Sequence, residues 1–381
     1  MATDKAPGER VTLAQSDSKS PETVDNLNSS DSSSSGNDVS TLGSSSNRTN
    51  LSSGSSGALN FSKTVRFRTP TPSTSSDSSP LLSSDLFFQR YTRHERISAG
   101  SFAVVYRIEE IATKKSFALK TPKDNSDESE FRREWRLHQG LCHQSVIRVF
   151  GYYDGALKEN HYNGVVMELG ATSLQDILEN QQLNLDDEGR ETACHIREVQ
   201  MKKYFCDVLL GLQYLKSKNI IHGDMKPDNV ILGLDGHMKI TDFGLSKQLE
   251  VGQRFDGTGG YGALCYRAPE CFAGIKEIIS VGFEADIWAT AVMLFQCLKG
   301  YYPFAKEPVE YEEEKEDEDE EEDEEEEIKQ MIRGGTFVDP PPKVLPQISP
   351  QAEELIVGML QVSLIDRWTV NECLAHHWFR V

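Results

Sequence analysis

The chain lacks long apolar runs. No stretch approaches the roughly 18 consecutive apolar residues that a membrane-spanning helix needs. The first residues, Met-Ala-Thr-Asp-Lys-Ala, also lack the apolar core of a secretory signal peptide. Seven cysteines are present, an odd number, and no two of them form a Cys-x-x-Cys pair, which indicates reduced thiols instead of a disulfide framework. We therefore expect an intracellular protein, cytoplasmic or nuclear, with no membrane attachment.

An excess of basic residues is missing as well. The formal net charge is −20, and Glu312–Glu327 alone holds fifteen acidic residues and one lysine, a net of −14, so that the rest of the chain carries −6. This balance gives no indication of nucleic-acid binding. We predict an acidic insert at residues 307–327. A run of like charges is typical of a solvated, disordered segment. The alternative is a patch that attracts basic substrates.

Large apolar side chains are scarce in residues 1–85, which consist mainly of Ser, Thr, Asn and Gly. A segment of this composition buries too little apolar surface to offset its loss of conformational entropy. We therefore predict a disordered Ser-rich tail at 1–85. It is followed by one domain at 86–381, which is long enough to form a large two-lobed unit.

The tail contains one unusual stretch, Lys63–Phe67, which reads Lys-Thr-Val-Arg-Phe. Its valine and phenylalanine are two positions apart and face the same side of an extended strand. The stretch resembles the motif by which many proteins dock onto the catalytic subunit of type 1 protein phosphatase. This phosphatase is therefore a candidate partner, and the alternative is an apolar cluster without a role.

A polar loop in the second half of the chain carries side chains suited to catalysis. The loop, His222–Asn229, lies between two short β-branched runs that are typical of buried strands. Asp224, Lys226 and Asn229 therefore project from one rigidly held turn. A carboxylate, an ammonium and an amide placed in this way could accept a hydroxyl proton, neutralise a phosphoryl oxygen and ligate a metal.

A second oxygen ligand follows shortly afterwards. Asp242-Phe243-Gly244 comes directly after another short strand, Met238–Ile240, so a glycine hinge stands behind a carboxylate. The alternative for His222–Asn229 alone is a polar surface turn. The two together, at this distance, favour one catalytic site.

These two stretches resemble the catalytic loop of the protein kinases, His-Arg-Asp-x-Lys-x-x-Asn, and the Asp-Phe-Gly that follows it. The resemblance extends from Tyr91 to Phe379. It implies an α+β, two-lobed protein kinase fold: a small β-rich N-lobe with one helix at 86–168 and a larger, mainly helical C-lobe at 169–381. It also implies ATP and Mg²⁺ as cofactors and proteins as substrates.

The resemblance implies a role for each polar residue. Asp224 accepts or orients the substrate's hydroxyl proton, and Lys226 neutralises the transferred group. Asn229 and Asp242 hold Mg²⁺ against the phosphates. A lysine two residues after the aspartate resembles the serine/threonine-specific kinases, so we expect Ser/Thr specificity.

The resemblance also places the nucleotide. Lys120 corresponds to the lysine that holds the α- and β-phosphates, and Glu134 to its ion-pair glutamate, with Glu130 as the nearby alternative. Met167 corresponds to the residue behind the adenine pocket. The residues expected to contact the nucleotide, from the glycine-rich loop to the hinge, are Ile97, Ser98, Ala99, Gly100, Ser101, Phe102, Ala103, Val104, Val105, Ala118, Lys120, Glu168 and Leu169.

Hydrophobic patterns predict the elements that carry these residues. Apolar residues recur every 3–4 positions from Met201 to Leu215, which predicts a buried helix there. The polar stretch Asn180–Arg197 is expected to be an insert. Asp286 resembles the aspartate that anchors the catalytic loop. The other predicted strands and helix are Phe88–Ile97, Val104–Ile108, Ser116–Lys120, Glu128–Leu141, Val146–Phe150 and Val165–Glu168.

After Gly244, the segment to Ala268-Pro269-Glu270 is expected to be the activation segment. Arg367 corresponds to the arginine that pairs with Glu270 in the family. Three serine, threonine and tyrosine hydroxyls are available there as phosphorylation sites: Ser246, Thr258 and Tyr261.

Three departures from the family pattern leave alternatives open. Gly223 replaces the arginine that commonly pairs with a phosphorylated activation segment, Ala263 replaces a threonine, and Ser98 and Ala103 replace two glycines of the phosphate-covering loop. The chain is therefore either an active kinase, with weak or no control by activation-segment phosphorylation, or a catalytically weak pseudokinase that acts as a scaffold. A small-molecule kinase is the third alternative, because His-Gly-Asp occurs in aminoglycoside and choline kinases, but those lack the Ala-Pro-Glu segment.

Overall fold

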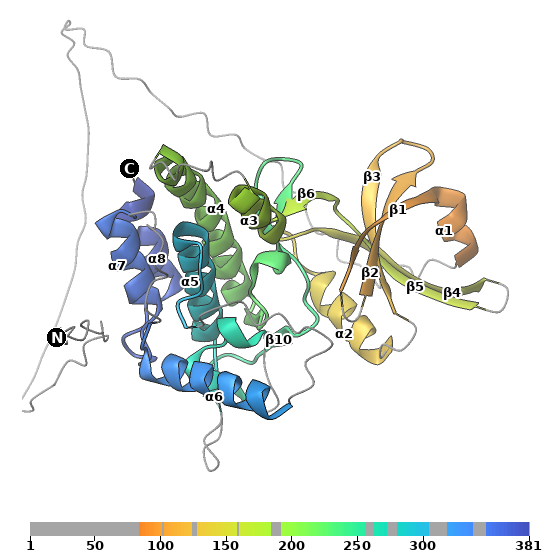
Figure 1. Ribbon diagram of the computed structural model, residues 1–381. Helices are drawn as coiled ribbons and strands as arrows, with labels where there is room; N and C mark the ends of the chain where they lie inside the picture. Colours follow the sequence, from red (N-terminus) through yellow and green to blue (C-terminus); the bar gives the residue numbers. More distant parts are fainter. Residues whose placement is uncertain are drawn as a thin grey trace, which may run out of the picture. The chain divides into compact units, whose positions relative to one another are not determined.

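The computed structural model describes residues 84–100, 103–123, 128–157, 160–183, 192–256, 262–272, 280–304, 318–337 and 348–380. The Lys63–Phe67 stretch and all but the last two residues of the predicted tail lie outside these ranges. The described chain forms a β-rich N-lobe, on the right in Figure 1, and a helical C-lobe. The predicted α+β fold class is confirmed.

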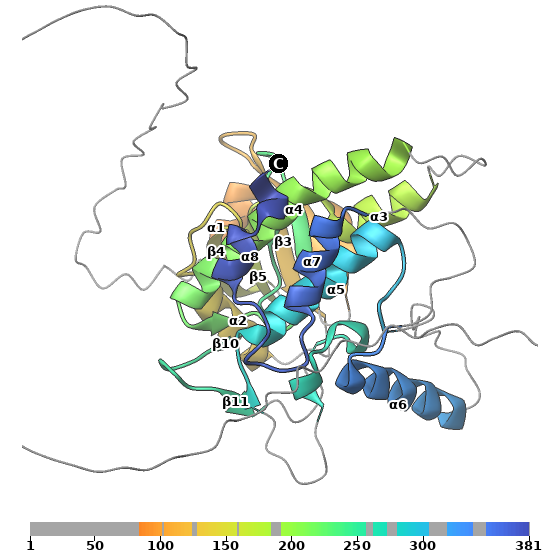
Figure 2. The same ribbon diagram turned by 90° about the vertical axis from the view of Figure 1, so that its left-hand side faces the viewer.

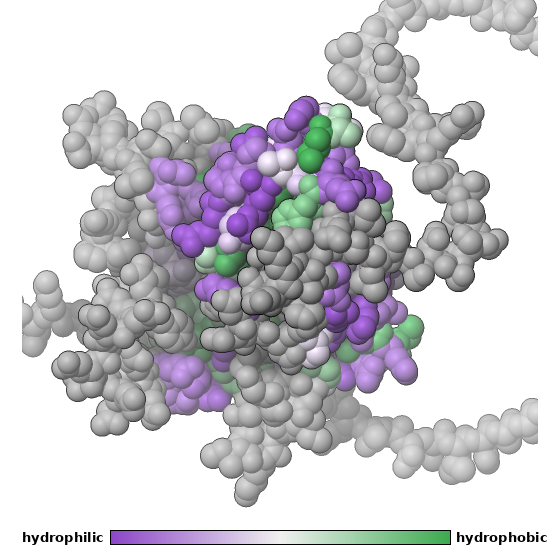
Figure 3. Space-filling view, turned by 90° about the vertical axis from the view of Figure 1, so that its right-hand side faces the viewer, coloured by the Kyte–Doolittle hydropathy of each residue, from purple (hydrophilic) through white to green (hydrophobic). Residues whose placement is uncertain are grey.

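The N-lobe is a five-stranded antiparallel sheet with the strand order β1-β2-β3-β5-β4. Helix α2 (Glu128–His138) buries Phe131 in an apolar cluster with Ala118 of the central strand β3. Beyond its first residue, β1 faces solvent, and the N-lobe side of the molecule is mostly hydrophilic in Figure 3. The strands are β1 (Tyr91–Ala99), β2 (Ala103–Glu110), β3 (Ser116–Pro122), β5 (Asn160–Met167) and β4 (Val149–Leu157).

Three predicted strand starts in the N-lobe are wrong. The strand expected from Val165 begins five residues earlier, at Asn160. The strand expected at Phe88–Ile97 begins as a helix, α1 (Ser84–Arg90), because buried Phe87 stacks on Tyr153 of β4 with ring centroids 3.9 Å apart. The strand expected from Val146 begins only at Val149, since Val146 instead forms a parallel bridge to Ile240 of the C-lobe.

The C-lobe is built on two long helices, α4 (Thr192–Ser217) and α5 (Glu284–Lys299), whose contact forms the centre of its core. Met201 and Leu215 of α4 are buried, as predicted. Nearly every residue of α5 is buried. The helices α3 (Leu174–Leu183), α7 (Pro350–Met359) and α8 (Val370–Ala375) complete the lobe (Figure 2).

The predicted polar insert at Asn180–Arg197 is partly wrong. Its beginning is the last turn of α3 and its end is the first turns of α4. Glu198, just after the predicted insert, explains why this polar stretch enters the core. Its carboxylate accepts hydrogen bonds from the Trp378 indole at 2.7 Å and from the Ser349 hydroxyl at 2.6 Å.

Disorder is the wrong prediction for the second part of the acidic run. The chain is helical from Glu318 as α6 (Glu318–Gly334). Ile328 and Ile332 are buried in the C-lobe core and anchor this helix, while Lys329 pairs with Glu325 at 3.3 Å, one turn away. Apolar anchors downstream of the charges therefore extend a helix into them. No helix among the described residues is long and apolar enough to cross a membrane.

Candidate active site

The polar loop is held from below by a buried carboxylate. The loop follows β7 (Ile220–Ile221), and the side chain of Asp286 on α5 accepts the backbone N–H groups of His222 and Gly223, each at 2.8 Å. Burial raises the pKa of Asp286, and the two N–H donors partly offset that effect. The predicted anchoring contact is thus present, and it fixes the first residues of the loop.

The three functional side chains of the loop converge. The Asn229 amide donates to the backbone oxygen of Asp224 at 2.7 Å and to its Oδ2 at 2.9 Å. The Lys226 ammonium lies 3.1 Å from the same Oδ2. Because the Asn229 nitrogen is engaged, the oxygen of its amide is the atom that can ligate a metal.

Asp242 follows β9 (Met238–Ile240) and adopts φ 61°, the left-handed conformation that few non-glycine residues occupy. The packing of the next residue, Phe243, explains why this backbone conformation is tolerated. Phe243 is fully buried, with its ring centroid 4.3 Å from that of His138 and 5.1 Å from that of His222. This packing fixes the backbone and directs the Asp242 carboxylate toward β3.

Lys120 joins three elements through its ammonium group. It donates to both Glu134 oxygens at 2.7 and 2.9 Å, which confirms the predicted ion pair, and to Asp242 Oδ1 at 2.9 Å. Burial by itself would lower the pKa of Lys120, but the two carboxylates outweigh it and raise that pKa. Burial would likewise raise the pKa of Asp242, but Lys120 lowers it to about 2. Both groups are therefore charged at neutral pH.

The predicted phosphate-covering loop is a hairpin turn between β1 and β2. Gly100 donates its N–H to the Ala103 carbonyl at 2.9 Å, while Ser101 and Phe102 lie outside the described residues. An apolar cluster of the sheet includes the residues expected to contact the base. Ala118 and Met167 are buried in one cluster, with Val105 and Leu169 packed against it. A flat apolar base would find its contacts here.

The hinge residue Glu168 is restrained on both sides. Its N–H donates to the Arg148 carbonyl at 2.8 Å, and its carboxylate pairs with Lys239 at 3.1 Å. The backbone N–H of Glu168, one of the two residues expected to contact the base, is therefore already engaged within the protein. Lys239 is a site-supporting residue that sequence reasoning missed, because its partner lies 71 positions earlier in the numbering.

A carboxylate and an amide oxygen, from Asp242 and Asn229, are the ligand types that Mg²⁺ prefers. With the ammonium of Lys120 beside them, the residues present fit a magnesium–nucleotide complex. Residues 91–379 match the family model for the protein kinase domain. The chain belongs to the protein kinase family.

Curated relatives agree with this assignment. The chain is 26% identical over 298 residues to serine/threonine-protein kinase stk11 of Xenopus laevis, covering 76% of this chain and 61% of that protein. It is 30% identical over 217 residues to serine/threonine-protein kinase RUNKEL of Arabidopsis thaliana, covering 56% and 14%. For serine/threonine-protein kinase 32C of Mus musculus the identity is 28% over 226 residues, covering 58% and 43%. The chain therefore spans less than two thirds of each of these relatives.

The kinase domain contains a contact that sequence reasoning missed. The guanidinium of Arg133, next to Glu134 on α2, donates to the backbone carbonyls of Gly244 and of Ser246, the latter at 2.8 Å. Both acceptors lie at the start of the activation segment. The same helix holds two other arginines, Arg132 and Arg136, so nothing in the local sequence distinguished Arg133. The contact holds α2 against the segment without a phosphate group.

In the activation segment, the prediction for Ser246 is wrong and the prediction for the Arg367–Glu270 pair is confirmed. Ser246 is fully buried and its hydroxyl donates to the His222 carbonyl at 2.9 Å, so it is not an accessible phosphorylation site. Thr258 and Tyr261 lie outside the described residues. Arg367 binds both Glu270 oxygens at 2.7 and 2.9 Å, which confirms the predicted pair.

The two replaced residues near the loop leave a small hollow. Gly223, Asp224 and Ala263 all line it. A side chain at Gly262 would meet the Gly223 carbonyl at 2.9 Å, and Gly262 has φ +81°, so glycine is required there for two reasons. The activation segment therefore passes close to the catalytic aspartate, with an alanine methyl where the family has a hydroxyl.

Proposed function

We propose that this protein transfers the γ-phosphate of ATP to serine and threonine hydroxyls of protein substrates. The observation that carries the proposal is the position of Lys120 Nζ, within 2.9 Å of both Glu134 and Asp242. This contact brings the phosphate-binding lysine and the metal-binding carboxylate together across the two lobes.

Each residue has a part in the transfer. Asp224 accepts or orients the proton of the substrate hydroxyl, held in place by Asn229 and by the anchored loop. Lys226 stabilises the charge on the transferred group, and Lys120 binds the α- and β-phosphates. Mg²⁺, held by Asn229 and Asp242, would supply further charge neutralisation when bound.

The proposed Ser/Thr specificity rests on Lys226 and on the relatives, which are serine/threonine-protein kinases. The intracellular location and the docking of type 1 protein phosphatase at Lys63–Phe67 also remain proposals, and both rest on the sequence alone. The acidic segment, now in part a helix, remains a candidate patch for steering basic substrates.

The experiment is phosphate incorporation from labelled Mg·ATP into a generic protein substrate. Asp242→Asn should abolish incorporation, because the neutral amide lacks the negative charge by which the carboxylate attracts Mg²⁺ and Lys120. Asp366→Asn, at an exposed position, is the matched control and should leave the rate unchanged. A wild-type protein that binds Mg·ATP without transferring phosphate would instead support the pseudokinase alternative.

A further inference from the structure

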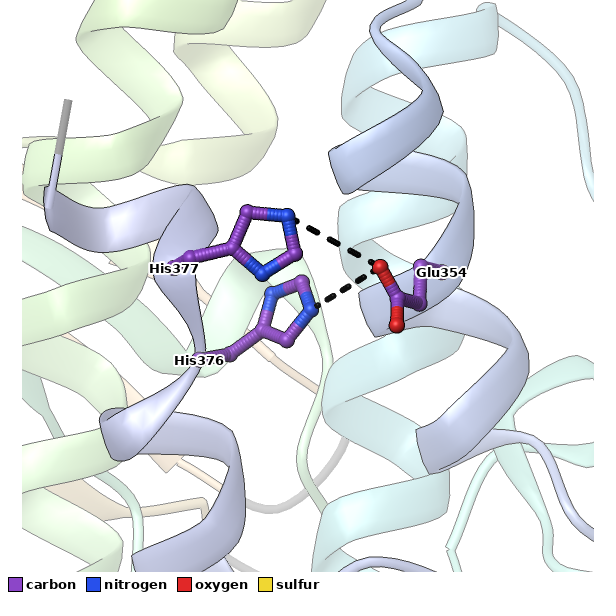
Figure 4. A group of neighbouring side chains, drawn as sticks. All are labelled: Glu354, His376 and His377. Carbon is purple, nitrogen blue, oxygen red and sulfur yellow. Dashed lines mark ion pairs between the residues drawn. The ribbon is translucent and has the colours of Figure 1, made fainter.

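A second group of ligand-type side chains lies at the far end of the C-lobe. Glu354 of α7 faces His376 and His377, which connect α8 to the final turn η4 (His377–Arg380) (Figure 4). The Nε2 atom of His376 lies 3.5 Å from Glu354 Oε2, and that of His377 lies 3.8 Å from the same oxygen. One ligand atom from each residue falls within 4.8 Å of the other two.

The inner histidine has a polar atom without a suitable partner. The side chain of His376 is 7% exposed, and its Nε2 has no hydrogen-bond partner among the described residues. Glu354 Oε2, at 3.5 Å, is too distant for a good hydrogen bond. A buried nitrogen left in this condition is costly, and native proteins usually satisfy such an atom. It points toward Glu354 Oε2, as Figure 4 shows.

The two distances to Glu354 approach the spacing of ligands in a tetrahedral metal site. With Zn–N and Zn–O bonds near 2.0–2.1 Å, neighbouring ligand atoms are about 3.4 Å apart. The two distances to Glu354 Oε2, 3.5 and 3.8 Å, are slightly longer than this edge. A small inward movement of the two exposed side chains, Glu354 and His377, would close the difference. We propose that Glu354, His376 and His377 bind Zn²⁺ or a divalent transition-metal ion of similar softness.

The ligand types exclude the metal of the catalytic site. Imidazole nitrogen suits zinc, copper and nickel, whereas Mg²⁺ and Ca²⁺ prefer oxygen ligands. The fourth position faces solvent, because His377 and Glu354 are 52% and 58% exposed. A water molecule or a ligand from outside would complete the coordination.

The ring of His376 is already oriented by its neighbours. It contacts the Trp368 ring with centroids 5.3 Å apart, and its Nδ1 accepts a hydrogen bond from the backbone N–H of Trp378 at 3.4 Å. A cation on Nε2 moves the ring proton to Nδ1, so that binding sacrifices this long hydrogen bond. The contact with Trp368 does not depend on the ring proton, and it reduces the ordering cost that a metal would otherwise meet.

Metal binding at this position would clamp two segments of the C-lobe. Glu354 belongs to α7, which begins after Ser349, while the histidines belong to the end of the domain. Glu198 already links the same segments through Ser349 and Trp378. The metal therefore adds a second clamp, and its effect should be on stability, with no direct effect on the phosphate-transfer residues.

The test uses the full-length protein, freed of metal by a chelator and then titrated with Zn²⁺ in the presence of constant Mg²⁺. Wild type should bind Zn²⁺, and its Tm should rise by about 5 °C when free Zn²⁺ reaches 100 times the Kd. His377→Ala and Glu354→Gln, both at exposed positions, should weaken binding at least tenfold, by analogy with other ligand losses. Glu353→Gln, on the same helix, should behave as wild type.

Differences between variants separate this site from any other zinc-binding residues of the chain. Equal Zn²⁺ affinity and an equal Tm shift in wild type, His377→Ala and Glu354→Gln would overturn the proposal. So would a wild type whose Tm does not respond to Zn²⁺. If Mg²⁺ alone raised the Tm as much as Zn²⁺ does, the site would not be selective for a metal that prefers imidazole nitrogen, and the proposal would be contradicted.

Discussion

Lys120 Nζ lies 2.9 Å from Asp242 Oδ1, although the two residues are 122 positions apart. The first is on the central strand of the N-lobe sheet, and the second follows a C-lobe strand. With Glu134 as the third partner, a single ammonium group fixes the relative position of the sheet, α2 and the Asp242 carboxylate. The proposed activity depends on this arrangement.

The first prediction is the effect of removing that ammonium. Lys120→Met should reduce phosphate transfer by at least about 100-fold, because a preorganised charge at the phosphates is lost and two carboxylates face each other without a cation. Steady-state kinetics with Mg·ATP measure the loss. Lys115→Met, at an exposed position just before the same strand, is the control. Equal rates for both variants would show that Lys120 has no role in transfer.

The second prediction concerns the contact between Arg133 and the start of the activation segment. Arg133→Met should lower kcat about tenfold, because α2 loses its hold on the carbonyls of Gly244 and Ser246. Faster hydrogen exchange at the amides of residues 244–246 should accompany the loss. Arg136→Met, exposed on the same helix, should change neither quantity. A normal kcat and normal hydrogen exchange in Arg133→Met would show that this contact does not hold the activation segment in place.

The third prediction restores a hydroxyl. Ala263 lines the hollow beside Asp224, so Ala263→Thr should raise kcat several-fold by adding a donor near the carboxylate, with the KM for ATP unchanged. Ala263→Val adds the same volume without the hydroxyl and should give no increase. If valine raises kcat as much as threonine does, packing is responsible and the hydroxyl is irrelevant.

The fourth prediction is a pH dependence of stability. Burial lowers the pKa of His138 to about 4, although its hydrogen bond to the Ile147 carbonyl and the charge of Asp242 oppose this; Lys120 and His222 act in the same direction as burial. The unfolded chain binds a proton near pH 6.5, whereas the folded chain binds it only near pH 4. The stabilisation due to neutral His138 is therefore complete above pH 6.5 and is lost as the pH falls toward 4.

The lost free energy of unfolding should be about 3 kcal/mol over that interval. Urea unfolding between pH 7.5 and 4.5 measures it. His138→Leu should reduce the slope, because leucine has no proton to gain, whereas His94→Leu, at an exposed position, should retain the wild-type slope. Parallel curves for wild type and His138→Leu would contradict the assignment.

The catalytic loop could be predicted from the sequence because its information is local. Asp224, Lys226 and Asn229 lie within six positions, and the strands on either side are short β-branched runs. Residues this close in a rigid turn must converge. The Lys120–Glu134 pair was predicted from family spacing, and the structure confirms the contact.

Other features of the site could not be predicted, because they depend on tertiary packing. Nothing near Lys239 or Arg133 in the sequence indicates a partner 71 or 111 positions away. The buried hydroxyl of Ser246 has the same origin, since only the folded chain brings it to the His222 carbonyl.

The errors in the fold have a similar cause. The strand predicted from Phe88 begins only at Tyr91, because the stacking of Phe87 on Tyr153 favours a helix up to Arg90. The acidic run reads as disordered, but Ile328 and Ile332, beyond its end, bind to the core and extend α6 back into the charges. In both cases packing against a distant residue outweighed the local pattern.

The measurement that tests the central claim most directly is phosphate transfer by Asp224→Asn, compared with its affinity for Mg·ATP. Asparagine retains the shape of the side chain and removes the proton acceptor. We predict that transfer falls by about 10²- to 10⁴-fold, while the Kd for Mg·ATP stays within about twofold of wild type, since Lys120 and Asp242 are intact. Transfer at the wild-type rate by Asp224→Asn would contradict the account.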